Sequence, residues 1–290
     1  MKILNRKIDL PERIFAISLL FVLLSFLAFY LIDLRNIYGA RDALFETSGA
    51  YFFFSYQPFF FQHWGRNSGF AEIIQWTFLG GSSVVASFCA AKMHNVNKKL
   101  FRFWIIISIA FLLMLIEDAG NLRHTLMSYI QWIFEERDQG IMGTLTEFTY
   151  FAILGGIPLY ALIRYWSEIK NFTKTKIYLL IGFAFYALAA SLSFLGTALE
   201  GLLPKNLYTV MGERFYEFAL TLGDPQLQSI WEEWNSGSWF KIEFFLFDSL
   251  IEENLEIIAS GALLAACVAF LLYITKERGK RGNRTNHSPK

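Results

Sequence analysis

Residues 101–120 read FRFWIIISIAFLLMLIEDAG, an apolar stretch with an arginine near its start and two acidic residues near its end. A helix of about 20 apolar residues crosses the roughly 30 Å hydrocarbon core of a bilayer. If Arg102 anchors one end at the membrane surface, the opposite surface falls near Asn121. The stretch therefore predicts a transmembrane helix that carries Glu117 and Asp118 about one turn inside the hydrocarbon boundary.

Similar stretches recur along the whole chain. Hydrophobic residues make up 54% of the sequence and charged residues 18%, against about 25% charged residues in a typical soluble domain. We expect an all-α, polytopic membrane helix bundle, with residues 1–275 as a single transmembrane domain and residues 276–290 as a disordered basic tail. About six transmembrane helices are predicted, at 14–33, 70–91, 101–120, 146–165, 176–197 and 253–274.

The distribution of charge predicts how these spans are oriented. Residues 1–13, 92–102, 164–176 and 276–290 together hold 18 basic and four acidic residues, a net charge of +14. The rest of the chain holds eight basic and 21 acidic residues, a net charge of −13. Basic residues concentrate in the cytoplasmic loops of membrane proteins, and an odd number of spans would destroy this segregation. We therefore expect a multi-pass protein of the cytoplasmic (inner) membrane with both termini in the cytoplasm.

The predicted outer connections are long and contain regular structure. The aromatic run at 51–64 is expected to form an interfacial or re-entrant element at the depth of the lipid headgroups. Apolar residues at helical spacing after Gly120 predict that the third span continues outward as an amphipathic helix to about Asp138. Asp224 followed by proline is typical of a helix start, and predicts short helices at 206–222 and 225–235 over the outer face.

Acidic residues mark the outer end of every predicted span. Because an ionised carboxylate that faces lipid is costly, those inside the membrane should face the bundle interior or a wet cavity. Glu117 and His124 lie seven residues apart, on one helical face if the helix is continuous, and Glu252 and Glu256 share a face at i, i+4. The candidate ligand- or cation-binding residues are Glu72, Glu117, Asp118, His124, Glu252, Glu253 and Glu256.

Oxygen ligands with one imidazole suit a divalent cation, so a possible metal site comprises Glu117, His124, Glu252 and Glu256. A divalent cation is the one cofactor that the sequence suggests. The competing interpretation is that acids at outward helix ends are solvated caps, which we expect for Asp33, Glu147 and Glu200.

Several functional classes leave no signature in this sequence. It contains no GxxxxGK[ST], HExxH, GxSxG or CxxC motif, no lysine in the middle of a predicted span, and no predicted span rich in arginine. Cys89 and Cys267 lie near the predicted cytoplasmic ends of their helices and are expected to be packing residues. Whether the protein is an enzyme is left open, and no nucleic-acid partner is indicated.

Three short segments resemble a group of uncharacterised bacterial multi-pass membrane proteins. Residues 116–124, IEDAGNLRH, resemble the acidic-pair-then-histidine motif of that group. Residues 247–256, FDSLIEENLE, leading to Gly261, resemble the EExxE-type opening of its last helix, and residues 66–76, RNSGFAEIIQW, resemble the start of its second helix. The resemblance implies that the candidate residues form one constellation and assigns it no chemistry. Membrane zinc hydrolases of the alkaline ceramidase type need three histidines, whereas only His63 and His124 lie on the predicted outer side.

These observations lead to one leading interpretation and two alternatives. The leading interpretation is an outward-facing, carboxylate-rich cavity that binds a cation or a small polar ligand. The alternatives are an intramembrane hydrolase that acts on lipid, and a non-catalytic subunit whose acidic outer face docks another envelope protein. The lipid bilayer is a partner in all three interpretations.

Overall fold

The computed structural model describes residues 9–48, 59–65, 69–134, 141–197, 207–237 and 241–285, and these are helical with no strand among them. Six of their helices are long and apolar enough to cross a bilayer, which confirms the all-α, multi-pass membrane architecture. The spans are α1 (Leu10–Ala28) with its continuation η1 (Phe29–Leu34), α4 (Phe70–Met93), α5 (Lys98–Gly120), α7 (Ile141–Ile169), α8 (Thr173–Thr197), and α12 (Glu253–Thr285), which follows α11 (Ile242–Phe245) and η3 (Leu246–Glu252) without a break.

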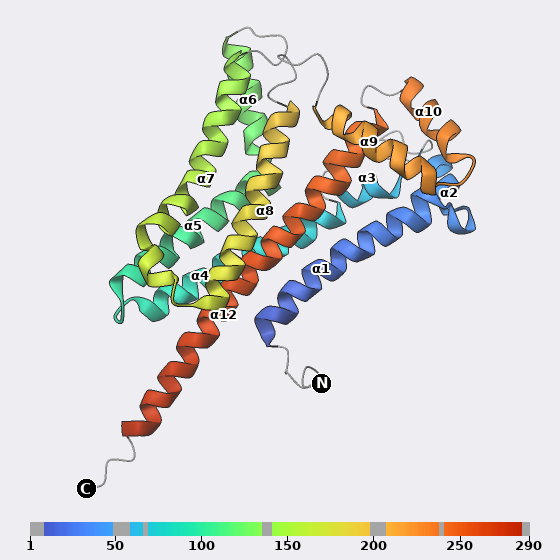
Figure 1. Cartoon of the computed structure of the whole chain (residues 1–290). Helices are drawn as coiled ribbons and strands as arrows, with labels where there is room; N and C mark the ends of the chain where they lie inside the picture. The colour runs from blue at the N-terminus through green and yellow to red at the C-terminus, as the bar shows by residue number, and fades with distance from the viewer. Residues whose placement is uncertain are drawn as a thin grey trace.

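The short helices gather at one end of the bundle, opposite the start of α1 and the end of α12 (Figure 1). They are η2 (Ile37–Gly39), α2 (Ala40–Ser48), α3 (Phe60–Gly65), α6 (Leu122–Ile133), α9 (Leu207–Leu222) and α10 (Leu227–Gly237). The predicted helices at 206–222 and 225–235 are therefore confirmed. The Asp224 carboxylate accepts hydrogen bonds from the backbone N–H groups of Gln226 and Leu227 at 2.8 and 3.0 Å, as the N-cap signal predicted.

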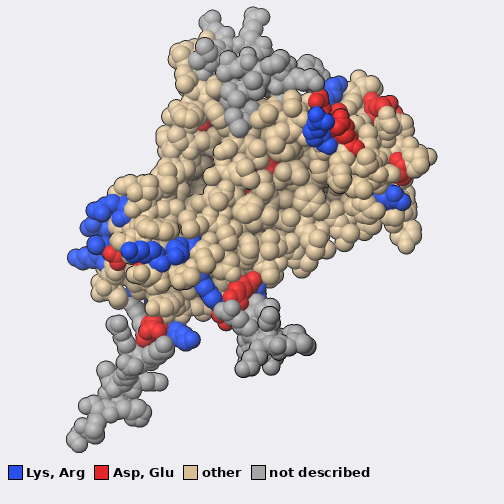
Figure 2. Space-filling view, viewed as in Figure 1, with Lys and Arg blue, Asp and Glu red and all other residues tan. Residues whose placement is uncertain are grey.

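Charge follows the same division of the molecule. Figure 2 shows Lys and Arg side chains gathered where α4 joins α5 and α7 joins α8, with an almost uncharged belt across the middle of the bundle. The exposed side chains of this belt are large and apolar, for example Leu23 and Ile163 at 64% and 72% exposure. Such a surface is suited to contact with lipid.

Helix α12 is the most buried of the spans and packs against α1, α4 and α8. Its small residues allow this close approach, because a side chain at Gly261 would meet Ser18 of α1. In the half of the bundle nearer the termini, Trp104 of α5 packs on Phe270 of α12 with ring centroids 4.7 Å apart. The apolar core therefore fills this half, and the polar residues lie toward the other end.

A second core lies under the short helices. Phe59 and Phe61 are fully buried and contact Trp234 of α10 and Phe29 of η1 through their rings. Phe59 and Phe61 thus pack against other helices of the protein, which the sequence did not reveal. The predicted depth of this run, interfacial or re-entrant, stays a prediction. Residues 51–58 of the aromatic run, with Arg66 and Glu200, lie outside the described residues.

Three predicted helix boundaries were wrong. The amphipathic helix predicted after Gly120 is present as α6, but it does not continue the third span, because Asn121 adopts a left-handed conformation (φ 48°, ψ 40°) that ends α5; its predicted end at Asp138 lies outside the described residues. The last span begins at Ile242, 11 residues before the predicted start, since the apolar run before Asp248 is helical too. Helix α12 also extends to Thr285, so most of the predicted tail is helical, and 286–290 lie outside the described residues.

Candidate functional site

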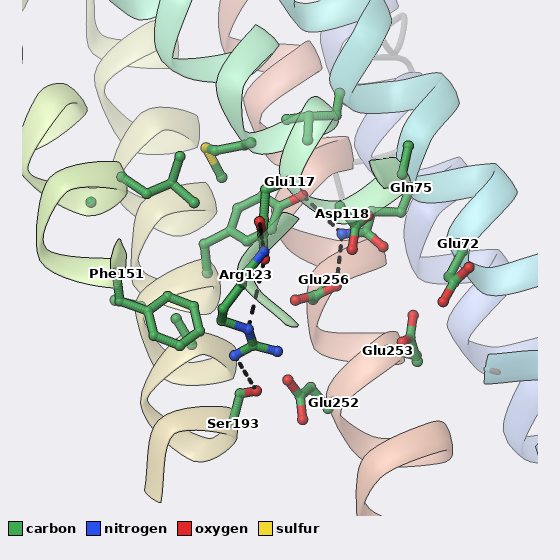
Figure 3. A pocket seen from close by; sticks show the side chains of 18 of the residues that line it. Glu72, Gln75, Glu117, Asp118, Arg123, Phe151, Ser193, Glu252, Glu253 and Glu256 are labelled. Atoms are coloured by element: carbon green, nitrogen blue, oxygen red, sulfur yellow. Dashed lines mark hydrogen bonds and ion pairs between the residues drawn. The ribbon is translucent and has the colours of Figure 1, made fainter. Parts of the chain in front are cut away.

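A cavity of about 860 Å³ opens among α4, α5, α6, α7, α8, η3 and α12, in the half of the bundle away from the termini. All seven candidate residues predicted from the sequence line it, and most are labelled in Figure 3. Among the described residues, the lining also includes Asp248 of η3 and one arginine, Arg123 of α6. The cavity is therefore strongly acidic.

Helix α4 joins the acidic residues of α5 to those of α12. Trp76 Nε1 donates to the Asp118 carboxylate at 2.6 Å, and the neighbouring Gln75 Nε2 donates to the Glu256 carboxylate at 2.6 Å and to the Tyr186 hydroxyl at 3.4 Å. Glu72, one turn earlier on α4, points toward Glu253 of α12 (Figure 3). Two adjacent residues of α4 thus hold carboxylates that come from two other helices.

Arg123 organises the opposite side of the cavity. Its Nη1 lies 2.8 Å from the Glu147 carboxylate and 3.2 Å from Ser193 Oγ, and its guanidinium carbon lies 4.7 Å from the centre of the Phe151 ring. Its backbone N–H donates to the Glu117 carboxylate at 3.2 Å, and its Nε lies 3.7 Å from the same carboxylate. Glu117 therefore caps the start of α6 and, with Glu147, balances the charge of the arginine.

Two acids expected to be solvated caps are buried instead. The side chain of Glu147 is 1% exposed and pairs with Arg123. Asp33 is fully buried, and its carboxylate accepts from the backbone N–H groups of Phe60 and Phe61 at the start of α3. The solvated interpretation was wrong for both residues, because their partners lie on elements that are distant in the sequence.

Three polar atoms in the cavity wall have no hydrogen-bond partner among the described residues: the donor Arg123 Nε, which lies 3.7 Å from the Glu117 carboxylate, and two acceptors. Gln75 is 1% exposed, yet its Oε1 accepts no hydrogen bond while its Nε2 is fully used. Glu253 Oε2 is likewise buried without a partner. Buried polar atoms in proteins nearly always have partners, so each of these needs an explanation.

The predicted metal set does not form a coordination shell in the described part of the chain. No group of three or more His, Cys, Asp and Glu residues there lies close enough together to hold a metal ion. The break at Asn121 turns His124 off the helical face of Glu117, and its Nε2 instead lies 3.1 Å from Arg123 Nη2. Glu117 and His124 were predicted to share one helical face, which requires a continuous helix through Asn121. The helix is broken there, so they do not share a face.

Glu252 is held by a residue that the sequence did not suggest. The hydroxyl of Tyr208 on α9 donates to the Glu252 carboxylate. Burial, together with the neighbouring Glu252, raises the pKa of Tyr208 above its usual value, so the hydroxyl stays protonated and able to donate. This contact ties α9 to the cavity at the point where η3 meets α12.

His124 predicts a dependence of stability on pH. Burial, followed by the nearby Arg123 charge, lowers the pKa of His124 from 6.5. The folded protein therefore favours the neutral imidazole, and below pH 6.5 the unfolded chain binds a proton that the folded chain resists. The contribution of His124 to the free energy of unfolding should fall as pH decreases from about 7 to about 5, so His124→Gln should gain stability relative to the native protein over this range. Chemical denaturation in detergent at several pH values measures the difference, and identical pH profiles for the two proteins would contradict it.

The residues that sequence reasoning missed are those that connect the acids. Tyr186, Ser193 and Tyr208 carry no spacing signal of their own, although Gln75 and Trp76 lie in a segment that resembled a family motif. Arg123 is different, because a basic residue so close to Glu117 in the sequence is a candidate to compensate the charge of the acids. Comparisons of the chain with models of known protein families, with curated proteins and with solved structures find no match.

Proposed function

We propose that the cavity binds a small cationic ligand, most favourably an organic ammonium group. The observation that carries this proposal is the pair of unpartnered acceptor atoms, Gln75 Oε1 and Glu253 Oε2, in an acid-lined cavity. Both atoms can accept hydrogen bonds from a ligand and can donate none if the carboxylate is ionised. A ligand that donates N–H groups and carries positive charge would complete both.

The charges of the cavity favour the same ligand class. Of the described residues, seven acidic side chains and one arginine line it: Glu72, Glu117, Asp118, Asp248, Glu252, Glu253, Glu256 and Arg123. Arg123 offsets Glu117 and Glu147, whereas Glu252, Glu253 and Glu256 form no ion pair with another described residue. Carboxylates so close in a medium of low dielectric constant cannot all remain ionised without a compensating charge. A bound cation would supply that charge, and otherwise shared protons must.

The size of the cavity also supports an organic ligand. A bare divalent ion needs several ligand atoms within about 2.0–2.6 Å of one point, and the described residues include no such group. A volume of about 860 Å³ lies within the range of pockets that bind small molecules. The divalent cation suggested by the sequence is therefore the second candidate.

The proposal extends to location. The two termini lie at the basic end of the bundle and the cavity lies toward the other end (Figures 1 and 2). The positive-inside rule assigns the basic end to the cytoplasm. On this basis the protein resides in a cytoplasmic membrane, with both termini inside and the cavity open to the outer half of the bilayer and its surface.

Thermal unfolding of the full chain in lipid nanodiscs tests the proposal. Ethylammonium chloride or MgCl2 is added, with NaCl at the same ionic strength as the reference. A bound ligand at about 100 times its Kd should stabilise the protein by about 2.7 kcal/mol, so ethylammonium should raise the unfolding midpoint. Glu253→Gln and Gln75→Leu should remove the increase.

Glu168 provides a matched control. It pairs with Lys99 at 3.2 Å at the basic end of the bundle, outside the cavity. Glu168→Gln should therefore keep the full ethylammonium effect. A midpoint that responds to neither cation, or one that rises equally in Glu253→Gln, would reject cation binding at this site.

A further inference from the structure

The cavity changes character along its length. One part is lined by the carboxylates and Arg123, and the other by Leu79, Met114, Leu162 and Phe183. A ligand that fills both parts must have a polar cationic end and an apolar end. A water-soluble cation would leave the apolar part unfilled.

Beside the apolar part, α7 and α8 make few contacts with each other, which leaves a gap between the two helices. Phe148 and Phe194 pack with ring centroids 5.8 Å apart, which fixes the register of the two antiparallel helices. Successive positions on the same faces then place Ala152 opposite Ala190 and Gly155 opposite Ala187. Small side chains thus face each other directly below the aromatic pair.

Residues beside this gap line the cavity and are accessible. They are Ala152, Gly155 and Ala187, which are exposed, and Leu159, which has 56% of its surface exposed. Among the described residues, no atom lies within 4 Å of a Cβ added at Gly155, so the space beside it is open. Helices α7 and α8 both cross the apolar belt, and the opening therefore lies where lipid surrounds the protein.

We propose that the ligand of the cavity is an amphiphile with an ammonium head group and an alkyl chain, which enters from the bilayer through the gap between α7 and α8. The ammonium group reaches the unpartnered oxygens of Gln75 and Glu253, and the chain lies against Leu162 and Phe183. This inference rests on the proposed cation site and adds the class of ligand and its route. A route through the apolar belt keeps the alkyl chain out of water at every point.

Photolabelling in nanodiscs tests the route. The probe is a dodecylammonium salt with a diazirine in its chain, mixed into phosphatidylcholine, and the labelled peptides are mapped by mass spectrometry. We expect labels on the cavity faces of α7 and α8, near Leu162 and Phe183. Glu253→Gln should reduce this labelling by about tenfold, which corresponds to the loss of one strong polar contact.

Gly155→Trp fills the gap and should also reduce labelling by about tenfold, while ethylammonium, which can enter from the outer surface, still raises the unfolding midpoint. Gly237→Trp is the matched control, because a Cβ at Gly237 of α10 also meets none of the described residues within 4 Å, and Gly237 is not part of the cavity lining. If Gly155→Trp does not fold, Ala187→Trp closes the same gap from α8.

Each result has a defined meaning. Undiminished labelling of the cavity in the folded tryptophan variants would overturn the lateral route, and undiminished labelling in Glu253→Gln would overturn recognition of the head group. Stabilisation by ethylammonium without cavity labelling would overturn the amphiphile and leave the cation site standing. If neither probe acts on the native protein, both proposals fail.

Discussion

Replacing Arg41 with leucine should lower the free energy of unfolding by about 3–5 kcal/mol, as removal of one partner from a buried ion pair usually does. The Arg41 side chain is fully buried and lies 2.9 Å from the Asp224 carboxylate. Its Nε also lies 3.3 Å from Asp42, and its Nη1 donates to the Asp33 carbonyl at 3.2 Å. The arginine thus ties η1 and α2 to the start of α10. Equilibrium unfolding in mixed detergent measures the loss.

Arg214 is the control for this prediction. It pairs with Glu217 on the exposed face of α9 at 3.3 Å, and the two side chains are 85% and 65% exposed. Surface ion pairs contribute little to stability, so Arg214→Leu should leave the unfolding transition almost unchanged. If the two variants lose equal free energies of unfolding, Arg41 contributes no more to stability than a surface arginine, and the prediction is wrong.

The spans could be predicted because their signal is local. About 20 apolar residues in sequence are sufficient to indicate a transmembrane helix, and each predicted span overlaps an observed one. The start of the last span could not be read in this way. Asp248 and Glu252 interrupt the apolar run, and the sequence alone cannot show that a cavity solvates them within the helix.

The members of the site were predictable, whereas their partners were not. Acids that cannot face lipid must face the interior, which was enough to group Glu117 with Glu253 and Glu256. Gln75 can donate a hydrogen bond to Glu256 because α4 packs against both α5 and α12. No local sequence pattern predicts this position of α4.

The same limit explains the errors over buried acids. Asp33 meets backbone N–H groups 27 and 28 residues away, and Glu147 meets Arg123 across 24 residues. A single residue in the left-handed conformation, Asn121, decides whether His124 follows Glu117 along one helix. Asn adopts this conformation more readily than most residues, but its presence alone does not require a break.

Arg123→Leu should also lower the free energy of unfolding by about 3–5 kcal/mol. The substitution leaves Glu147, 1% exposed, and Glu117, 13% exposed, without their cation. Adding Glu147→Gln to the variant should restore part of the loss, because the buried charge is then removed together with its partner. Unfolding of both variants and of Glu147→Gln alone completes the double-mutant cycle. Additive losses would show that Arg123 and Glu147 do not interact.

Glu253→Gln should have the opposite effect on the ligand-free protein, although it lies in the same cavity. Glu253 lies near Glu72 and Glu256, and among the described residues it pairs with no arginine and its Oε2 has no hydrogen-bond partner. Neutralising it removes repulsion between carboxylates, so the unfolding midpoint should stay equal or rise. The variant should lose stabilisation by added ethylammonium, as expected for a ligand group. A loss of stability as large as that of Arg123→Leu would place Glu253 among the structural ion pairs and remove it from the binding site.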